Sequence, residues 1–460
     1  MKNRVVLLVG LNAKFSHTAL GVRSIGAYLT HQGVPNTVAE YSINDPYESI
    51  FYDIIAKKPD VIGFSTYLWN ISLVNRLMAD IKLALPGVTV FLGGPEAGYH
   101  ETPETAFPLA DHVIAGEGEG AVYRYLTGEE PDGEFPHLPF PYTFPLTKGK
   151  TVYYEASRGC PYRCSYCISS LEKHLRFKPL PQVKEELSRL IEAGAGKVKF
   201  IDRTFNVNPD AYEIFKFVIE NGQNTGFHFE IKPELFSERD FALLETAPKG
   251  RIQFEAGLQS LNPETLTAIC RKNDCETAFS NLKRILSMGN IHLHLDLIAG
   301  LPFEDKASFI CGFNEVYKLH PHMLQLGFLK ILNGTRMKEK VSEYGIVYSP
   351  HPPYQVISTR WLSVDDIREL KLAEAGLDTF SNKGFFPDAL SYLWEVSDKT
   401  PYEIFLSLGQ ALSEEPPLSH PRLFRLFYEW YVTQGMNHPE IFLEKLQEDF
   451  KRKNPNKPMF

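Results

Sequence analysis

Short apolar runs alternate with helix-like segments over the first 127 residues, and this alternation limits the folds open to the chain. The runs typical of strands are Val5–Gly10, Asn36–Tyr41, Val61–Ser65, Val88–Leu92 and His112–Ala115. The helical segments between them are Ala19–Gln32, Tyr47–Lys57 and Asn70–Leu85. Such alternation predicts a parallel, doubly wound α/β sheet, whose strands are apolar throughout because both faces are covered.

A second alternating series begins at Thr151 and predicts a full or partial (β/α) barrel, with functional residues at the C-terminal ends of its strands. The strand segments are Val152–Glu155, Lys197–Ile201, His228–Ile231, Ile252–Ala256 and His292–Ile298. The helical segments include Pro181–Ala193, Ala211–Asn221 and Cys275–Met288. Between Gly128 and Lys150, Pro, Gly, Phe and acidic residues indicate a linker.

Beyond about Thr335 the strand signal fades and the chain becomes aromatic-rich and mostly helical. Its helical segments are Ser363–Ala375, which Gly376 is expected to end, Tyr402–Leu412 and Pro421–Gln434. The organisation predicted is therefore a doubly wound domain over 1–127, a linker over 128–150, a barrel over 151–335 and a helical cap over 336–460.

Charge and cysteine content bound the function. A net charge of −8 argues against broad electrostatic capture of nucleic acid. The apolar run after Met1 is too short for a signal peptide, so we interpret it as a strand, and no stretch is long enough to span a membrane. Three of the six cysteines fall within eight positions, which suits a metal site in a reducing, cytoplasmic compartment.

The densest chemical signal is the segment from Ser157 to Cys167, in which Cys160, Cys164 and Cys167 are spaced C-x3-C-x2-C. Glycine and proline beside the first cysteine predict a loop directly after a strand. Three thiolates can hold three irons of a [4Fe–4S] cubane and leave the fourth open, whereas four-cysteine sites close it. The alternative is a zinc knuckle that lacks one ligand, or three cysteines together by chance.

In this motif, with Tyr166 before its last cysteine, the chain resembles the radical S-adenosylmethionine (SAM) superfamily. The resemblance implies that the open iron binds the amino and carboxylate groups of SAM. It further implies that the reduced cluster splits SAM to methionine and a 5′-deoxyadenosyl radical. An electron donor such as flavodoxin or ferredoxin is the partner that this chemistry implies.

The barrel resembles the branch that includes oxygen-independent coproporphyrinogen dehydrogenase. The similar stretches are Phe254–Asn262, with its trailing Arg271, and Asp296–Pro302. By resemblance, Gln259 and Asp296 line the SAM pocket, and Arg271 pairs with the methionine carboxylate, which a guanidinium fork suits. The same resemblance assigns the ribose hydroxyls to Glu230. Where the family often has Gly-Gly-Glu, this chain has Asp202, our candidate for the amino contact. The alternative for each residue is an ordinary polar side chain at a barrel rim.

The N-terminal domain resembles the cobalamin-binding domain that precedes many radical SAM cores. The similar segments are Gly63–Thr66, Gly93–Glu96 and Gly116–Glu119, where glycines after strands permit close approach of a large cofactor. The resemblance implies that Ser65, Gly93 and Gly94 contact the nucleotide tail of cobalamin. The histidine motif D-x-H-x-x-G is absent, so no protein histidine is expected on cobalt, and His17 is interpreted as a polar loop residue.

Two further observations on cysteine concern the kind of radical SAM protein that the chain resembles. Cys270, Cys275 and Cys311 are interpreted as buried, inert thiols rather than a second cluster. No cysteine precedes Cys160, whereas methylthiotransferases place three cluster cysteines in their N-terminal domain.

These features together predict an enzyme that methylates an unactivated carbon of a small-molecule or peptide substrate, which the sequence does not identify. SAM would then serve as radical source and as methyl donor to cobalamin. One alternative is radical cyclisation, rearrangement or oxidation, with or without cobalamin. Another is a binding protein that senses cobalamin or SAM.

Overall fold

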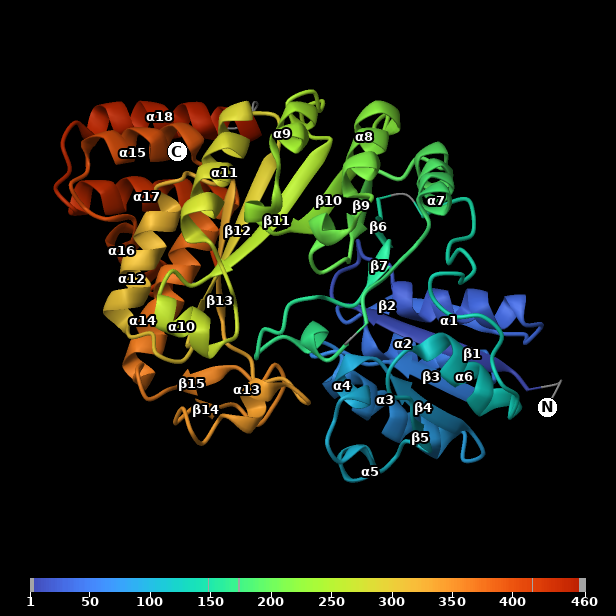
Figure 1. Ribbon diagram of the computed structural model, residues 1–460. Helices are drawn as coiled ribbons and strands as arrows, with labels where there is room; N and C mark the ends of the chain where they lie inside the picture. The colour runs from blue at the N-terminus through green and yellow to red at the C-terminus, as the bar shows by residue number, and fades with distance from the viewer. Residues whose placement is uncertain (1–3, 148, 173, 416, 455–460) are drawn as a thin grey trace.

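The computed structural model of the chain describes residues 4–147, 149–172, 174–415 and 417–454 (Figure 1). The barrel lies in the middle, with the N-terminal domain against one side and the C-terminal helices against the other. None of the described helices is both long and apolar enough to cross a bilayer.

The N-terminal domain is a five-stranded parallel sheet of order β2-β1-β3-β4-β5, so the predicted doubly wound fold is confirmed. Its strands are β1 (Val6–Asn12), β2 (Thr37–Ser42), β3 (Val61–Ser65), β4 (Thr89–Gly93) and β5 (His112–Val113). Its helices are α1 (Leu20–His31), α2 (Tyr47–Ala56), α3 (Ile71–Ala84), α4 (Pro95–Gly98), α5 (Pro103–Ala106) and α6 (Gly118–Thr127). Apolar residues of α1 and α6 form one core, and those of α2 and α3 form a second core on the other face.

The barrel is a six-stranded parallel sheet of order β13-β12-β11-β10-β9-β6. Its strands are β6 (Thr151–Tyr154), β9 (Lys197–Phe200), β10 (Gly226–Ile231), β11 (Ile252–Gln259), β12 (His292–Ala299) and β13 (Met323–Phe328). Among the described residues β6 and β13 do not pair, so the barrel is partial, and β13 is a strand that the sequence analysis missed.

Helices and short elements connect these strands. The helices are α7 (Leu180–Glu192), α8 (Ala211–Asn221), α9 (Glu238–Leu244), α10 (Pro263–Ala268), α11 (Cys275–Met288) and α12 (Lys306–Tyr317). The short elements are β7 (Ser157–Arg158), β8 (Arg176–Phe177) and the 3₁₀ turns η1 (Ile168–Ser170), η2 (Phe205–Val207) and η3 (Pro233–Leu235).

The C-terminal part is helical apart from one small hairpin. Its elements are α13 (Arg336–Glu339), β14 (Val347–Tyr348), β15 (Val356–Ser358), α14 (Val364–Leu377), the π-helical turn η4 (Asp378–Asn382), α15 (Pro387–Val396), α16 (Pro401–Ser413), α17 (His420–Thr433) and α18 (Pro439–Lys453). The expected helix end at Gly376 is wrong, because α14 continues through it. A Cβ there would lie 2.0 Å from the Phe405 carbonyl oxygen, so this glycine allows α14 and α16 to pack closely.

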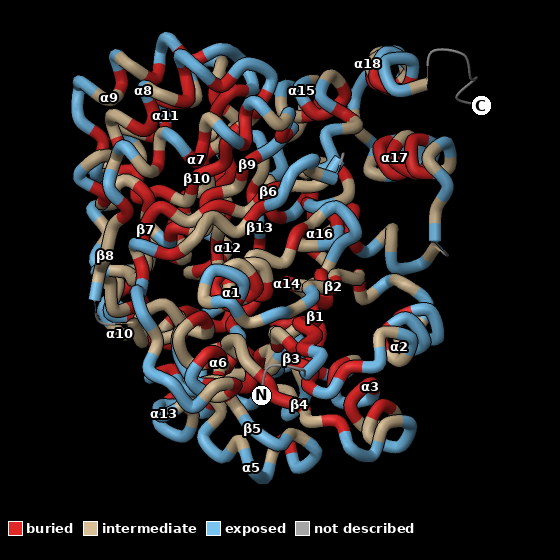
Figure 2. Tube along the Cα trace, turned by 90° about the vertical axis from the view of Figure 1, so that its right-hand side faces the viewer, coloured by how far each residue is buried: buried red, intermediate tan, exposed pale blue. Residues whose placement is uncertain are grey.

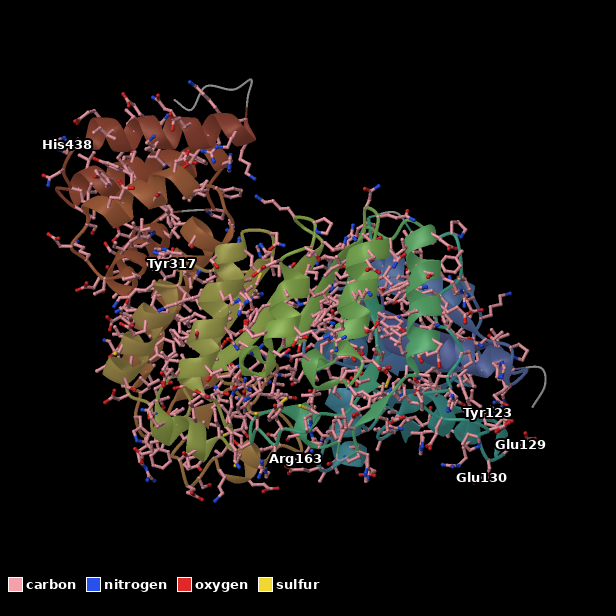
Figure 3. The ribbon with its side chains drawn as sticks, turned by 45° about the horizontal axis from the view of Figure 1, so that its top comes forward. Tyr123, Glu129, Glu130, Arg163, Tyr317 and His438 are labelled. Atoms are coloured by element: carbon pink, nitrogen blue, oxygen red, sulfur yellow. The ribbon has the colours of Figure 1, made fainter. Side chains whose placement is uncertain are left out.

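The C-terminal helices share one continuous core with the barrel, and Figure 2 shows its buried segments running through the strands. Tyr317 of α12, labelled in Figure 3, lies at this junction. Its ring meets Trp394 at 5.3 Å and Phe405 at 5.0 Å between centroids. The cap is therefore packed against the barrel on the side away from the N-terminal domain.

Candidate functional site

The three-cysteine segment forms a loop that leaves the barrel after β7. Gly159 adopts φ +90°, and a Cβ there would lie 2.4 Å from the His174 carbonyl oxygen, so only glycine fits this turn. Arg163, labelled in Figure 3, donates to the carbonyl oxygens of Ser170 (3.1 Å) and Glu172 (2.9 Å). The loop is therefore folded back on itself by its own side chains and held in one shape.

All three cysteines line one cavity of about 340 Å³ at the C-terminal ends of the barrel strands. Cys164 is buried, while Cys160 and Cys167 are partly exposed to the cavity. Four of the predicted SAM-site residues line the same cavity: Glu230, Gln259, Arg271 and Asp296. The structure therefore brings together residues that are up to 136 positions apart, from Cys160 to Asp296.

The polar side chains of this cavity are incompletely satisfied. The Arg271 guanidinium lies beside the cluster loop, with Nη1 3.6 Å from Cys164 Sγ, while Nη2 donates to the Gly257 carbonyl oxygen. Among the described residues, Arg271 Nε, Gln259 Oε1 and Asp296 Oδ1 are buried without a hydrogen-bond partner. Buried polar atoms are rarely left unpaired, so these atoms mark places where a bound molecule would supply the partner.

Backbone strain lies in the same place. Gln259 adopts φ +70°, and the pairing of β11 with β12 shifts register between Gly257 and Gln259. A positive φ is costly for a residue with a side chain, and such strain gathers at binding sites. The bulge turns the glutamine into the cavity at the end of its strand.

The position of Asp202 differs from the one expected for a contact with the amino group of SAM. Its side chain is 1% exposed and does not line the cavity. Its oxygens accept hydrogen bonds from the Ser157 hydroxyl (2.5 Å) and the Ala156 amide (3.1 Å), and burial raises its pKa to about 6. This carboxyl group therefore positions the start of the cluster loop, and its placement does not support a contact with the amino group of SAM.

Two cationic residues in the cavity were missed by the sequence analysis. Arg203, which follows β9, lies 3.5 Å from Glu230 Oε1. Burial raises the pKa of Glu230, and Arg203 counteracts that shift. Lys232, which follows β10, lines the same wall. Both come directly after a barrel strand, which was the available signal.

The N-terminal sheet carries a second cavity, of about 220 Å³, at the C-terminal ends of β1, β3 and β4. The predicted contact residues Ser65, Gly93 and Gly94 all line it. Chain connections leave β1 in opposite directions toward β2 and β3, which makes this edge the switch point where doubly wound sheets bind ligands. Gly94 adopts φ +92°, and a Cβ there would lie 2.7 Å from the Thr66 carbonyl oxygen.

The cluster loop touches both cavities. Residues 168–170 line the cysteine cavity, and Glu172 lines the cavity of the N-terminal sheet. At the start of the same loop, Arg158 pairs with two glutamates of the N-terminal domain, Glu117 and Glu119. One short segment thus separates the two cavities and contacts both domains.

Other residues singled out from the sequence take structural positions. His17 pairs with Thr151 in a short parallel bridge, and its Nδ1 lies 3.2 Å from the Tyr153 hydroxyl, so it joins the two domains. The expectation of buried thiols outside the cluster is wrong for Cys270 and Cys311, which are exposed, while Cys275 is partly buried. Cys270 and Cys311 lie on the solvent side of their segments, and the hydrophobic pattern of the sequence does not indicate this exposure.

Comparison with known families follows the same division of the chain. Residues 6–126 match the family described as "B12 binding domain", and residues 154–310 match "Radical SAM superfamily". The chain therefore combines a segment similar to B12-binding domains with a segment similar to the radical SAM superfamily. Residues 342–459 match a family described as "Protein of unknown function (DUF4080)". The predicted cofactor classes, an iron–sulfur cluster with SAM and cobalamin, are confirmed by the first two matches.

The chain is also similar to a "2-(S-pantetheinyl)-carbapenam-3-carboxylate methyltransferase" of Streptantibioticus cattleyicolor. The two are 25% identical over 346 residues, which are 64% of this chain and 51% of the relative. The "cobalamin-dependent radical SAM methyltransferase TokK" of Streptomyces tokunonensis is 25% identical over 348 residues, covering 65% and 51%. The chain spans about half the length of these curated relatives. The radical SAM methyltransferase TsrM of Kitasatospora setae, solved with cobalamin and a [4Fe–4S] cluster, has the same fold at TM-score 0.65 and 14% identity, covering 99% of this chain and 100% of that one.

The residues of the two cavities fit the cofactors of the matching families. In the barrel, three cysteines and three residues with an unpartnered buried polar atom line one cavity, which is the donor set that a cluster and a zwitterionic ligand require. In the N-terminal domain, the only described neighbour of a Cβ built on Gly93 is Ile114 at 3.8 Å, so this glycine borders open space on the cavity wall. The tail of cobalamin would occupy that space.

Proposed function

We propose that this protein methylates an unactivated carbon atom of a small-molecule or peptide substrate. When bound, a reduced cluster with SAM would supply a carbon-centred radical able to remove a hydrogen atom from the substrate, and cobalamin would supply the methyl group. The observation that carries the proposal is the placement of the two cavities: the cysteine loop lines both, so chemistry begun in one is next to the cofactor held in the other.

The side chains of the barrel cavity have distinct roles in this proposal. Cys160, Cys164 and Cys167 hold three irons of the cluster. Arg271, which lines the cavity and whose buried Nε has no hydrogen-bond partner among the described residues, binds the carboxylate of SAM as a charge-assisted pair. Glu230 accepts hydrogen bonds from the ribose hydroxyls, and Gln259 and Asp296 line the pocket.

The N-terminal cavity supports the second half of the proposal. Ser65, Gly93 and Gly94, which line this cavity, would contact the tail of cobalamin, and we expect no histidine of this chain to hold the cofactor. His17 is engaged by Tyr153 and Thr151. We therefore expect His17→Ala to leave the absorption spectrum of bound cobalamin unchanged.

The compartment and the electron donor follow from the same chemistry. Three thiols that must remain reduced to hold iron suit the cytoplasm. A one-electron donor such as flavodoxin or ferredoxin would reduce the cluster. The net charge of −8 favours a substrate other than nucleic acid.

Labelled SAM tests the proposal. The reconstituted protein, with hydroxocobalamin, a reductant and an extract of small metabolites, is incubated without oxygen with methyl-deuterated SAM. We expect both 5′-deoxyadenosine and S-adenosylhomocysteine, together with a product heavier by a deuterated methyl group. Formation of 5′-deoxyadenosine alone would indicate radical rearrangement or oxidation. If neither 5′-deoxyadenosine nor S-adenosylhomocysteine formed, the protein would be a sensor of cobalamin or SAM. Cys164→Ala is the control and should abolish every product.

A further inference from the structure

The lumen of the barrel holds a cluster of charged and imidazole side chains, of which only Glu230 and Asp296 were assigned above. Along β9, β10, β11 and β12 the apolar side chains pack into the surrounding core, and the alternate positions face the lumen. The polar side chains at lumen positions include Lys199, His228, Glu230, Glu255, His294 and Asp296. A barrel interior is usually filled by branched apolar residues, so this polar layer needs an explanation.

Three of these side chains, Glu255, His294 and Asp296, bring donor atoms together, and His228 contacts the first of them. His228 Nε2 lies 2.9 Å from Glu255 Oε2, and His294 Nε2 lies 3.1 Å from Asp296 Oδ1. One donor atom from each of Glu255, His294 and Asp296 lies within 4.8 Å of the other two. Ligand atoms about 2.1 Å from a shared metal ion are about 3 to 3.5 Å apart, so His294 Nε2 and Asp296 Oδ1 already have the spacing of a coordination shell, and Glu255 would turn inward to join them.

The nitrogen atoms of this cluster are not satisfied by hydrogen bonds. His228 is 3% exposed and His294 is 6% exposed. The Nε2 atoms of both, and Asp296 Oδ1, make no aligned hydrogen bond with any described residue, although an oxygen or nitrogen lies close by. Buried imidazoles normally have a partner for each ring nitrogen. Each imidazole thus has a carboxylate as its close neighbour, and a cation shared between them would satisfy both without an aligned hydrogen bond.

We propose that Glu255, Asp296 and His294 bind one divalent transition-metal ion in the lumen, separate from the iron–sulfur cluster. One imidazole and two carboxylates are a donor set that suits Zn²⁺, Fe²⁺ or Mn²⁺, and the two carboxylate charges balance that of the ion. His228, whose Nε2 lies 2.9 Å from Glu255 Oε2, orients that carboxylate. Lys199 Nζ, 3.2 Å from Glu255 Oε2, orients the same carboxylate from outside the metal shell.

The position of the site indicates its use. Glu255 and Asp296 also line the cavity that holds the cysteines and Arg271. A coordination position left open by the protein would face that cavity and take an oxygen donor, such as a carboxylate or hydroxyl group of a substrate. This use of the ion rests on the proposed function, whereas binding of the ion does not.

Metal binding to the full-length, cluster-loaded protein tests the proposal without SAM, cobalamin or substrate. Equilibrium dialysis against Zn²⁺ with elemental analysis should give one zinc per chain in addition to the iron of the cluster. X-ray absorption at the zinc edge should show nitrogen and oxygen ligands at about 2.0–2.2 Å. Sulfur at about 2.3 Å would instead place the zinc on the cysteines and overturn the proposal.

Variants on one strand provide a matched comparison. His294→Ala should weaken zinc binding at least 100-fold, and Glu255→Gln, which preserves the side-chain shape, should do the same if the alanine variant folds poorly. His292→Ala is the control, because His292 is a histidine of the same strand, two positions earlier. Equal zinc affinity in the His294 and His292 variants, or no retained zinc in the unmodified protein, would leave the cluster as a hydrogen-bonding network and refute the metal site. A failed methylation assay would not affect this result.

Discussion

Arg158 lies two residues before the first cluster cysteine and extends into the N-terminal domain. Its Nη2 is 2.7 Å from Glu119 Oε1, its Nη1 is 2.8 Å from Glu117 Oε2, and its Nε is 3.0 Å from Glu155 Oε2. The arginine side chain is 11% exposed and that of Glu119 is 7% exposed. We predict that Arg158→Met, which keeps the apolar stem but removes the charge, destabilises the contact between the domains.

The magnitude follows from the carboxylates left behind. Burial opposes ionisation of Glu119, yet Arg158 and the Ser24 hydroxyl hold its pKa below the ordinary range. Removing one partner of a buried ion pair costs about 3–5 kcal/mol. Glu155 limits the loss, because burial already raises its pKa to about 7 and it can bind a proton. We therefore expect a loss of about 3 kcal/mol at pH 8, at the lower end of that range.

The pH dependence has a definite sign. Without Arg158, the folded-state pKa of both buried glutamates rises above the unfolded value, so the folded form binds protons more tightly than the unfolded chain. Stability of the variant is then greatest below the unfolded pKa and falls as pH increases through the folded pKa. The loss in free energy of unfolding, relative to the unmodified protein, should be smaller at pH 6 than at pH 8.

Urea unfolding at both pH values, followed by circular dichroism, measures the deficit. The double variant Arg158→Met/Glu119→Gln should recover much of the loss, since it removes the stranded charge. Arg124→Met is a matched control, because Arg124 and its partner Glu130 are exposed. A deficit below about 1 kcal/mol at pH 8, or one that does not change with pH, would refute the buried-charge argument.

Three further predictions concern the cavities and the barrel. Arg271→Ala should weaken SAM binding about 10- to 100-fold with the cluster iron retained, as measured by calorimetry without oxygen, and unchanged binding would contradict the carboxylate assignment. Gly93→Leu should abolish binding of hydroxocobalamin in equilibrium dialysis. The fold should persist in this variant, because a Cβ at Gly93 meets no described atom closer than 3.8 Å, whereas Gly94→Leu should also destabilise the domain. Burial raises the pKa of Glu304 to about 7, so the free energy of unfolding should fall as pH rises from about 4.5 through 7. Glu304→Gln should increase the free energy of unfolding, measured in urea at pH 8, by about 2–3 kcal/mol.

The sequence predicts the fold well where burial on both sides makes a strand apolar throughout. For this reason the prediction for Val61–Ser65 coincides with the observed strand. The edge strand Met323–Phe328 escapes the pattern because it alternates apolar residues with Gln325, which is exposed. Gly376 misleads for another reason: glycine commonly ends helices, but here it serves a close helix–helix contact that no local pattern records.

The site is only partly encoded in local patterns. The cysteine spacing and the motif around Gln259 are recognisable in the sequence alone, and the residues of both line the cavity. Asp202 differs because its oxygens are taken by Ala156 and Ser157, and a sequence does not show which polar groups are already paired. The convergence of His294 with Glu255 likewise depends on the register of neighbouring strands.

The distance between the two cofactor sites is set by side chains rather than by the linker. The cluster loop is held to the barrel by Asp202, to the N-terminal domain by Arg158, and to itself by Arg163. Under the proposed methyl transfer, a substrate radical must meet its methyl donor in close alignment, at about 3–3.5 Å, before it reacts elsewhere. Burying charges at the domain contact costs desolvation free energy, so their presence there is better explained by positioning than by stability. Loss of Arg158 should therefore disturb coupling between the cofactors even where each still binds.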